Sequence, residues 1–400
     1  MADDTYVLDL WVTGASIVSV KDDGTGNDTI RVKGVYSKTI AIDLAWTIAD
    51  GTPLNAGSNY HSADDINHQL VIFGVIENAF GSNGCDVIAG NDLGNLLSGD
   101  QDQFGAGMSD TISGGDGDDR IYGGAGDDDL QGQAGDDAMW GDAGNDRIDA
   151  GSGIDTVEGG SGADRLDGGG DAGDTLSYAT SLRGVIVQLQ AGTATIGRGG
   201  DAEGDQISGF FNVIGSALKD RIDFADKTTL PFGQSDNAVY GGAGGDKITV
   251  GGGDDQVFGG KGNDVIYGEL GNDTLSGDIG SDKLSGGYGQ DFLTGGIGAD
   301  RFIFAAPASS LPDSPDVIAD FSTFDHDRID LKAIDADITH GGNQAFQWIT
   351  SDFTGAPGAL RAEAQGSDLV ISADIIGDGQ ADFSILLRDI LVVTQADFIL

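Results

Sequence analysis

Residues 105–167 read GAGMSDTISGGDGDDRIYGGAGDDDLQGQAGDDAMWGDAGNDRIDAGSGIDTVEGGSGADRLD, and residues 241–303 repeat the same pattern. Cut every nine residues, the two stretches give fourteen units in one register. Position four is glycine in thirteen units, with Met108 the exception, and position eight is apolar in all fourteen, from Ile112 to Phe302. Position six is always aspartate: Asp110, Asp119, Asp128, Asp137, Asp146, Asp155, Asp164, Asp246, Asp255, Asp264, Asp273, Asp282, Asp291 and Asp300. Compositional bias does not fix residues to positions in this way, so the pattern is a structural repeat.

The period excludes an amphipathic helix, whose apolar stripe recurs about every 3.6 residues. The apolar residue lies between two polar ones, as in Thr274-Leu275-Ser276, which is typical of a short strand with one inward side chain. The preceding glycines and aspartates tolerate tight reversals of the chain. Each unit is therefore predicted to be a turn plus a short strand, and two units to make one coil of an all-β, parallel β-roll.

Two units per coil place every second aspartate on the same edge of the roll. Asp119, Asp137 and Asp155 are expected along one edge, and Asp128, Asp146 and Asp164 along the other. Adjacent strands lie about 4.8 Å apart, so each edge becomes a column of carboxylates that repel one another unless a cation lies among them.

The donor atoms favour calcium. Carboxylates and glycine carbonyls are hard oxygen ligands that suit the six to eight oxygens of Ca²⁺, whereas Mg²⁺ requires a strict octahedron and retains waters. Zinc and copper would favour His or Cys, which the two arrays lack, since Cys85 precedes them. The sequence therefore predicts several bound Ca²⁺ ions.

The unit G-G-x-G-x-D-x-(apolar)-x resembles the RTX, or hemolysin-type, calcium-binding nonapeptide. The resemblance implies a parallel β-roll with calcium ions held between successive turns along both edges. A disordered glycine-rich linker is the alternative, but such linkers lack a phased apolar residue. Besides the fourteen aspartates, the candidate metal-binding residues of the first block are Gly114, Gly115, Gly117, Gly123, Gly124, Gly126, Gly132, Gly135, Gly141, Gly144, Gly153, Gly159 and Gly162. Those of the second block are Gly241, Gly244, Gly253, Gly259, Gly260, Gly262, Gly268, Gly271, Gly277, Gly280, Gly286, Gly289 and Gly298.

The acidic composition limits the partners. The chain has 400 residues, 69 of them glycine, and a formal net charge of −46. This charge argues against nucleic acid and against an anionic membrane surface as partners. It also predicts that folding is coupled to metal binding, because the metal-free chain resists compaction.

Length and motifs predict five segments. Outside the arrays, residues 23–31 (DGTGNDTIR) and 75–98 (VIENAFGSNGCDVIAGNDLGNLLS) resemble the entry to the calcium-binding half of serralysin-type secreted metalloproteases. Residues 316–321 (DVIADF) and 327–335 (DRIDLKAID) resemble the C-terminal region of that family, whose last residues act as a type I secretion signal. The segments are an N-terminal β segment (1–80), a first roll (81–177), a β connector (178–214), a second roll (215–303) and a serralysin-like C-terminal β region (304–400), the terminal segments being β-sandwich-like.

Targeting signals point to export without a cleaved leader. The start, Met1 to Asp4, has no basic region and no apolar stretch, so no Sec signal peptide is expected. No apolar run is long enough to span a membrane. The acidic and apolar end, Asp397 to Leu400, fits a type I signal, and a buried final strand would explain it equally well. The single cysteine allows no intramolecular disulfide.

Two further stretches outside the repeats carry structural expectations. Residues 184–197 (GVIVQLQAGTATIG) alternate as a strand or a hairpin. Residues 374–379 (DIIGDG) resemble a calcium loop at first sight, but the third position is Ile376, where such loops have Asp or Asn.

No catalytic motif is evident. The four histidines, His61, His68, His326 and His340, do not form H-E-x-x-H, so the serralysin zinc site is absent. Neither G-x-S-x-G nor a Walker A loop occurs, and paired aspartates are too numerous to indicate a glycosidase. Aromatic residues at position nine are expected to cover the sheet surface, although rings of this kind also stack on sugars: Tyr122, Trp140, Tyr240, Phe258 and Tyr267.

Three functional hypotheses follow. The first is a secreted, non-enzymatic calcium-binding protein that folds outside the cell and serves adhesion, a surface layer or a scaffold, with calcium and the type I secretion machinery as partners. The second is a polysaccharide-active enzyme or a degenerate serralysin-like protein that uses the rolls for export and folding. The third, compatible with the first, is a carbohydrate-binding or self-assembling module at the cell surface.

Overall fold

The computed structural model describes residues 81, 85–100, 108–190, 195–224 and 236–400, together with the backbone of six short strands in the first 80 residues. The chain forms two compact units. Unit 1 comprises Met1–Tyr178 and Gly192–Phe211, and unit 2 comprises Ala179–Ala191 and Asn212–Leu400. The described residues form strands and three short 3₁₀ turns, with no α-helix, which confirms the all-β prediction. The 3₁₀ turns are η1 (Gly200–Ala202), η2 (Pro307–Ser309) and η3 (Gln395–Asp397).

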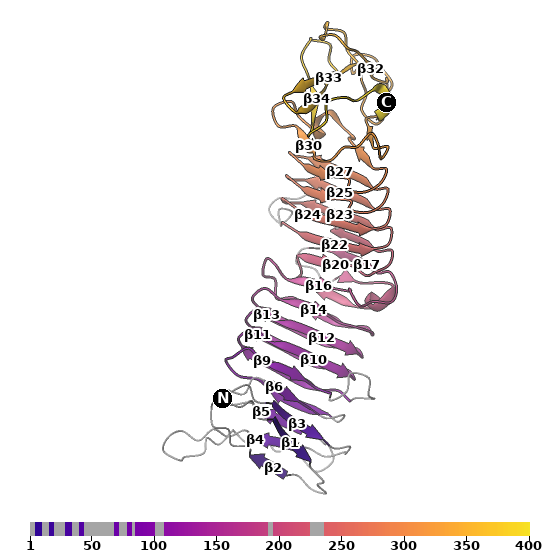
Figure 1. Ribbon diagram of the computed structural model, residues 1–400. Helices are drawn as coiled ribbons and strands as arrows, with labels where there is room; N and C mark the ends of the chain where they lie inside the picture. Colours follow the sequence, from indigo (N-terminus) through magenta and orange to yellow (C-terminus); the bar gives the residue numbers. More distant parts are fainter. Residues whose placement is uncertain are drawn as a thin grey trace. The chain divides into compact units, whose positions relative to one another are not determined.

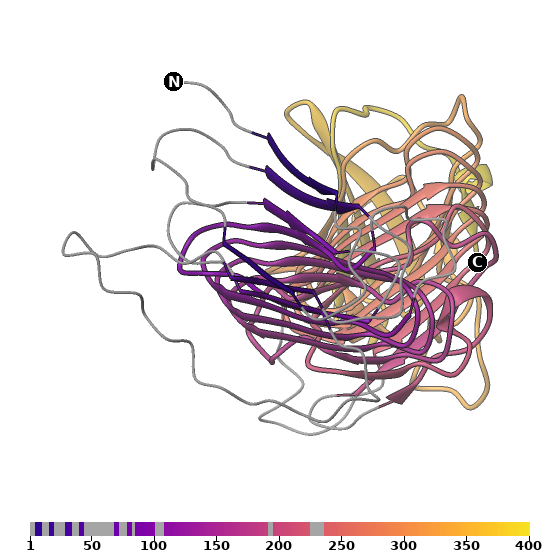
Figure 2. The same ribbon diagram turned by 90° about the horizontal axis from the view of Figure 1, so that it is seen from below.

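Unit 1 is a stack of coils in which the chain alternates between two parallel sheets (Figure 1). The first sheet contains, in order, β1 (Thr5–Asp9), β3 (Thr29–Lys33), β6 (Asn78–Phe80), β8 (Leu96–Ser98), β10 (Arg120–Ala125), β12 (Ala138–Ala143), β14 (Thr156–Glu158) and β16 (Thr175–Ser177). The second contains β2 (Ser16–Ser19), β4 (Ile40–Asp43), β5 (His68–Val71), β7 (Asp86–Ala89), β9 (Thr111–Asp116), β11 (Asp129–Ala134), β13 (Arg147–Ser152), β15 (Arg165–Asp167) and β19 (Gln206–Ser208). Seen from below, the coils of this unit lie one behind another (Figure 2).

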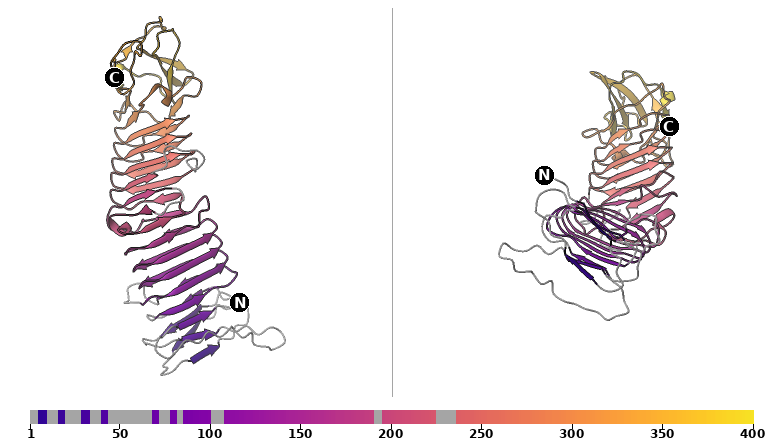
Figure 3. Two further views of the ribbon diagram at one scale, coloured as in Figure 1. Left: turned by 180° about the vertical axis from the view of Figure 1, so that it is seen from behind. Right: turned by 60° about the horizontal axis from the view of Figure 1, so that its bottom comes forward.

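Unit 2 repeats this plan and ends in antiparallel strands. One sheet contains β20 (Asn212–Ile214), β22 (Ala238–Ala243), β24 (Gln256–Lys261), β26 (Thr274–Ser276), β28 (Phe292–Thr294) and β30 (Asp316–Ile318). The other contains β17 (Ile186–Leu189), β21 (Arg221–Phe224), β23 (Lys247–Gly252), β25 (Val265–Leu270), β27 (Lys283–Tyr288), β29 (Arg301–Ile303), β31 (Arg328–Asp330) and β36 (Phe398–Ile399). The alternation of strands is visible from behind in Figure 3.

The C-terminal region continues the roll before it departs from it. Strand β35 (Phe383–Leu387) pairs in parallel with β30, and β34 (Asp368–Asp374) runs antiparallel between β35 and β33 (Ala359–Gln365). The short β32 (Gln347–Trp348) completes this sheet beside β33.

The pairing register shows why the repeat has nine residues. Strands of one sheet pair with an offset of 18 residues, as for Ile121 with Met139 and Leu130 with Ile148, so two units make one coil. All fourteen position-eight side chains are at most 1% exposed and form the core between the sheets. Burying an aliphatic side chain of this size contributes roughly 1.5–3 kcal/mol, so the core stabilises every coil by a similar amount.

Residues 184–197, expected as a strand or a hairpin, contain two strands in their described part, and these do not pair with each other. Strand β17 pairs in parallel with β21, whereas β18 (Thr195–Ile196) pairs antiparallel with β19. The segment predicted as a single connector, 178–214, therefore contributes strands to both units. The isolated repeat-like unit at residues 23–31 lies outside the described residues, apart from the backbone of β3.

Candidate metal centre

The position-six aspartates form four hydrogen-bonded columns. Within each column, Oδ1 of an aspartate accepts the backbone N–H of the aspartate one coil earlier. The distances are 2.8 Å for Asp119 to Asp137, 2.8 Å for Asp137 to Asp155 and 2.8 Å for Asp128 to Asp146. In unit 2 the same bond measures 2.7 Å between Asp246 and Asp264. Each carboxylate is thus held by the coil that precedes it.

The columns extend beyond the fourteen units. Residues 164 and 205, 291 and 316, and 300 and 327 are joined by the same bond, in which the later aspartate accepts the earlier amide. Sequence analysis did not place Asp205, Asp316 or Asp327 in a column, because loops lengthen their spacing. A usable signal was present: each precedes a buried apolar residue by two positions, as Asp316 precedes Ile318 and Asp327 precedes Ile329.

The second oxygen of every repeat aspartate is buried and accepts no hydrogen bond from the described residues. This holds for Oδ2 of all fourteen position-six aspartates and for Oδ2 of Asp316. A buried carboxylate oxygen without a partner carries a large desolvation cost, which a cation offsets. The columns therefore present a row of negatively charged oxygens in need of a positive partner.

Without metal, the aspartates of the columns have raised pKa values. Burial, and then the neighbouring carboxylates, raise the pKa of Asp110 to about 9 and of Asp146 to about 9, against the lowering effect of the backbone N–H that each accepts. The same causes raise the pKa of Asp273 to about 8 and of Asp137 to about 7. Ionised carboxylates in these positions are unfavourable unless a cation balances them.

Where position one is glycine, it leaves space beside the unpartnered oxygen of the same unit. A Cβ on Gly114 would lie 2.0 Å from Oδ2 of Asp119 and 2.8 Å from the carbonyl oxygen of Gly132 on the next coil. A Cβ on Gly268 would lie 2.1 Å from Oδ2 of Asp273 and 2.5 Å from the carbonyl oxygen of Gly286. A carboxylate oxygen and a carbonyl oxygen therefore converge on a point that only glycine leaves open. We call this space the position-one cradle.

Glycines at positions two and four shape the turns. All thirteen position-four glycines have positive φ, from 100° at Gly117 to 158° at Gly280. A Cβ on Gly144 would lie 1.6 Å from the carbonyl oxygen of Gly126, so successive coils approach too closely for any side chain there. Position two also has positive φ throughout the described residues, where glycine is replaced four times, by Gln133, Asp142, Glu269 and Asp278.

The donor set fits calcium. No group of three or more His, Cys, Asp or Glu side chains in the described part of the chain is arranged to hold a metal ion. The donors that the columns offer are the unpartnered aspartate Oδ2 atoms and the backbone carbonyl oxygens beside them. An all-oxygen set from flexible turns suits Ca²⁺ better than Mg²⁺ or Zn²⁺.

A second, exposed ladder runs at position five, and sequence analysis missed it. Oδ1 of Asp118 accepts the backbone N–H of Asp136 at 2.9 Å, and Oδ1 of Asp127 accepts that of Asn145 at 2.8 Å. Asparagine acts in the same way, since Oδ1 of Asn145 accepts the N–H of Ala163 at 3.0 Å. Because Asn replaces Asp here, this ladder requires an acceptor and no charge.

In the first repeat unit, Gly99 takes the place that the sequence pattern assigns to Gly105. Gly105 opens the first unit in the sequence, but it lies in the undescribed segment 101–107. A Cβ on Gly99 would lie 2.0 Å from Oδ2 of Asp110 and 2.5 Å from the carbonyl oxygen of Gly123. Gly99 therefore supplies the cradle for Asp110, and the inserted residues follow it.

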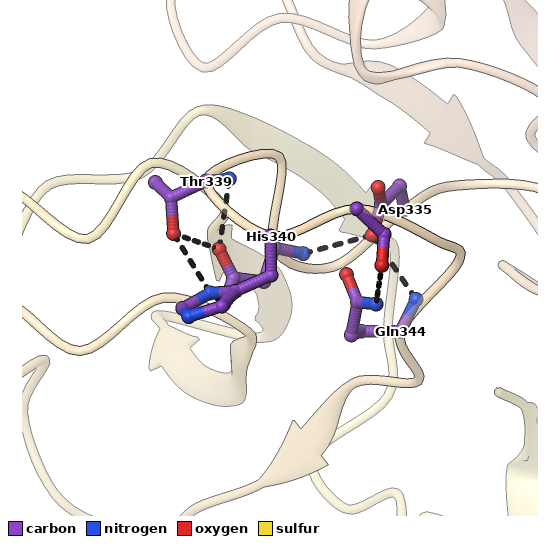
Figure 4. Close-up of polar contacts among 6 residues, drawn as sticks. Asp335, Thr339, His340 and Gln344 are labelled. Carbon is purple, nitrogen blue, oxygen red and sulfur yellow. Dashed lines mark hydrogen bonds and ion pairs between the residues drawn. The ribbon is translucent and has the colours of Figure 1, made fainter.

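The other candidate residues form turns. His340 Nδ1 lies 2.6 Å from Oδ2 of Asp337, and Asp335 accepts the backbone N–H of Gln344 at 3.1 Å, in an exposed loop together with Thr339 (Figure 4). The hydrogen bond from Thr339, followed by His340, lowers the pKa of Asp337. The side chains of His61 and His68 lie outside the described residues.

The loop at residues 374–382 also has its carboxylates engaged by the backbone. Asp374 accepts the N–H groups of Gly377 at 2.7 Å and Gly379 at 3.0 Å, and Oδ2 of Asp382 accepts those of Ile375 at 2.7 Å and Ile376 at 2.9 Å. These bonds close the loop as a turn, consistent with the poor match of its sequence to a calcium loop.

Residues 104–139, 140–173, 233–266, 240–275 and 267–302 match the sequence profile of the RTX calcium-binding nonapeptide repeat. These are RTX repeats. Their aspartate ladders imply that the chain binds Ca²⁺. The RTX repeats coincide with the two stretches in which the cradle and the unpartnered Oδ2 atoms recur.

Two solved structures resemble this chain in part. The AlgE6R3 subunit of the mannuronan C5-epimerase from Azotobacter vinelandii is 24% identical, with a TM-score of 0.25, covering 43% of this chain and 82% of that subunit. The extracellular lipase LipA from Serratia marcescens is 17% identical, with a TM-score of 0.23, covering 94% of this chain and 45% of the lipase. The chain thus spans less than half of the lipase. Comparison with curated proteins gave no significant match.

Proposed function

We propose that this chain is a secreted calcium-binding RTX protein that folds on binding Ca²⁺ outside the cell and then serves an adhesive, surface or scaffolding role. The observation that carries the proposal is the row of buried Oδ2 atoms without hydrogen-bond partners, nine of which converge with a carbonyl oxygen on a glycine cradle. The aspartates and the glycine carbonyls would hold the ions, and bound Ca²⁺ supplies the positive charge that makes the columns stable.

Coupling between folding and calcium follows from the charge. The chain has a formal net charge of −46, and the columns bring ionised carboxylates together inside each unit. Cytosolic calcium is too low to fill weak sites, whereas extracellular modules bind calcium in the range of about 10⁻⁴–10⁻³ M. The free energy of binding then becomes free energy of folding, and the chain stays unfolded until it leaves the cell.

The C-terminal end supports both export and packing. In the folded chain, Phe398 and Ile399 form β36 beside β31, and the Phe398 ring lies 5.2 Å from that of Trp348. An unfolded chain would expose the same apolar residues to the type I secretion machinery. One segment therefore serves as a signal before folding and as an edge strand afterwards. Among the described residues, no helix is both long and apolar enough to cross a membrane.

We propose no catalytic activity for the chain. The residues nearest to an acid–base pair, His340 and Asp337, lie in an exposed loop and close a turn. Activity against alginate-type polymers or casein that is lost on changing His61 or His68 would instead support an enzyme.

A role in carbohydrate binding rests on the aromatic side chains at position nine. Tyr122 stacks on Trp140 at 4.5 Å, and Tyr240 stacks on Phe258 at 5.1 Å, with the rings nearly parallel. Each of these rings therefore has one face packed against its neighbour, as expected of aromatic side chains that cover the surface of a sheet. Glycan arrays and sedimentation with and without calcium would distinguish carbohydrate binding from self-assembly.

The test is far-UV circular dichroism during a calcium titration from a chelator to ~10 mM, with Mg²⁺ as the control cation. A cooperative transition from coil to β-structure with calcium alone is expected. A chain that is already folded in the chelator at neutral pH, or that folds equally with Mg²⁺, would refute calcium-driven folding.

A further inference from the structure

Two of the fourteen units lack the glycine at position one. Twelve have glycine there, whereas the unit of Asp155 has Ala150 and the unit of Asp255 has Val250. Both replacements are buried, with Ala150 0% and Val250 1% exposed. Their side chains therefore point into the same interior as the cradles of the other units.

Backbone conformation does not explain the preference for glycine at position one. Among the described residues, the position-one glycines such as Gly114 and Gly132 lie outside the positive-φ set, unlike those at positions two and four. An alanine is conformationally acceptable at such a position. What excludes a side chain is space, because a Cβ on Gly132 would lie 2.2 Å from Oδ2 of Asp137 and 2.3 Å from the carbonyl oxygen of Ala150.

Alkyl groups thus occupy the space in which the ligand oxygens converge elsewhere. Calcium binds oxygen ligands at about 2.3–2.6 Å, so a methyl group beside the carboxylate competes for the position of the ion. In the unit of Asp255 the group is the larger isopropyl side chain. We call a position-six aspartate together with the position-one residue of its unit a rung. In these two rungs the alkyl group leaves no room for a Ca²⁺ ion beside the carboxylate.

The neighbouring rungs of the same columns also differ from the regular units. After Asp155 comes Asp174, whose coil has Gly168; a Cβ there would lie 2.9 Å from the Phe210 ring and 2.8 Å from the carbonyl oxygen of Gly209. Before Asp255 comes Asn237, whose amide side chain lacks the charge of aspartate. In unit 2 an uncharged amide therefore replaces a carboxylate next to the rung of Val250, whereas in unit 1 Asp174 keeps its carboxylate and the Phe210 ring lies beside its position-one glycine.

We propose that each unit has an interrupted calcium column, in which the rungs of Ala150 with Asp155 and of Val250 with Asp255 bind no ion and are held by apolar packing. This inference rests on the proposed calcium binding and adds which rungs take part. Calcium fills the continuous column of each unit and only part of the other. The interrupted rungs belong to the sixth of the seven units of the first array and to the second of the seven units of the second array.

The test is the number of calcium ions bound per full-length chain, measured by equilibrium dialysis and elemental analysis. Val250→Gly opens the cradle and is expected to add one ion, as is Ala150→Gly. Val250→Ala is the matched control, because it removes most of the side chain but keeps the Cβ, and it is expected to leave the count unchanged. An unchanged count in Val250→Gly, or an added ion in Val250→Ala, would overturn the inference.

A second pair of variants keeps the packing of the rungs intact. Asp255→Asn is expected to leave the ion count unchanged, whereas Asp273→Asn, one rung further along the same column, is expected to lower it by one. A loss of one ion in Asp255→Asn contradicts an empty rung. A wild-type chain that binds no calcium would refute the proposed function itself, and this outcome is distinct from all the others.

Discussion

Acid should replace calcium in folding this protein. In the metal-free roll, the pKa of Asp137 is raised to about 7 from a usual value of 3.8, first by burial and then by the neighbouring carboxylates. Asp137 is 2% exposed, so solvent screens this effect little. A shift of one pKa unit corresponds to about 1.4 kcal/mol, so keeping this one group in the metal-free roll at pH 7 costs about 4 kcal/mol.

The sign of the effect is fixed by the direction of the shift. A pKa raised by folding means that the folded chain binds more protons, so stability falls as pH rises from 3.8 to about 7 for Asp137 and to about 9 for Asp146. Domains are stable by only about 5–15 kcal/mol, so a few such groups are enough to unfold the metal-free chain at neutral pH. Below pH 4 this penalty disappears.

The assay begins with protein stripped of calcium at pH 8 and desalted into metal-free buffers, because chelators lose affinity in acid. Far-UV circular dichroism from pH 8 to pH 3 should show a gain of β-structure on acidification, and sedimentation should show whether the product is monomeric near the sequence pI of about 4.1. With ~10 mM calcium the dependence should reverse, since protons compete for the ligands. A metal-free chain that is fully folded at pH 8, or that gains no structure in acid, would refute the reasoning.

Three further predictions concern single side chains. Asp137→Asn should lower the apparent calcium affinity at least about tenfold while Asp136→Asn, in the exposed position-five ladder, leaves it unchanged, and equal calcium titrations of the two would contradict the column model. Ile121→Asp should lower the free energy of unfolding by at least about 3 kcal/mol even in saturating calcium, against less than about 0.5 kcal/mol for Arg120→Ala, as measured by urea denaturation. Glu269→Gly should raise the melting temperature, because Glu269 has a φ of 80° that costs a non-glycine residue about 1 kcal/mol; a lower melting temperature would count against strain at position two.

The repeat made the roll predictable because one period carried three independent signals. The apolar residue at position eight predicted the inward side chain, the glycines predicted the turns, and the aspartate predicted the columns. The sequence did not predict which oxygen of each carboxylate accepts an amide and which is left for a cation. That division depends on the contact between a coil and the coil before it, which no single unit specifies.

Irregular spacing concealed the rest. Asp205 follows Asp164 by 41 residues, yet it accepts the same hydrogen bond as residues 18 apart. Residues 184–197 were expected to form a strand or a hairpin, and the sequence could not decide between the two, because alternation of apolar residues predicts a strand but not its partner. Ala150 and Val250 replace position-one glycines, and only their burial and the geometry of the other cradles give this exchange a meaning.

The hydrogen bonds of the position-six columns persist when the spacing between aspartates is irregular, so the roll tolerates inserted residues. Consecutive rungs are separated by 24, 25, 26, 27 and 41 residues where loops intervene, and the amide-to-carboxylate bond persists in every case. The roll can therefore be lengthened by adding coils of 18 residues. Independently of its length, peptides can be inserted at the turns. A protein built in this way can vary its reach and its recognition loops without redesigning its core.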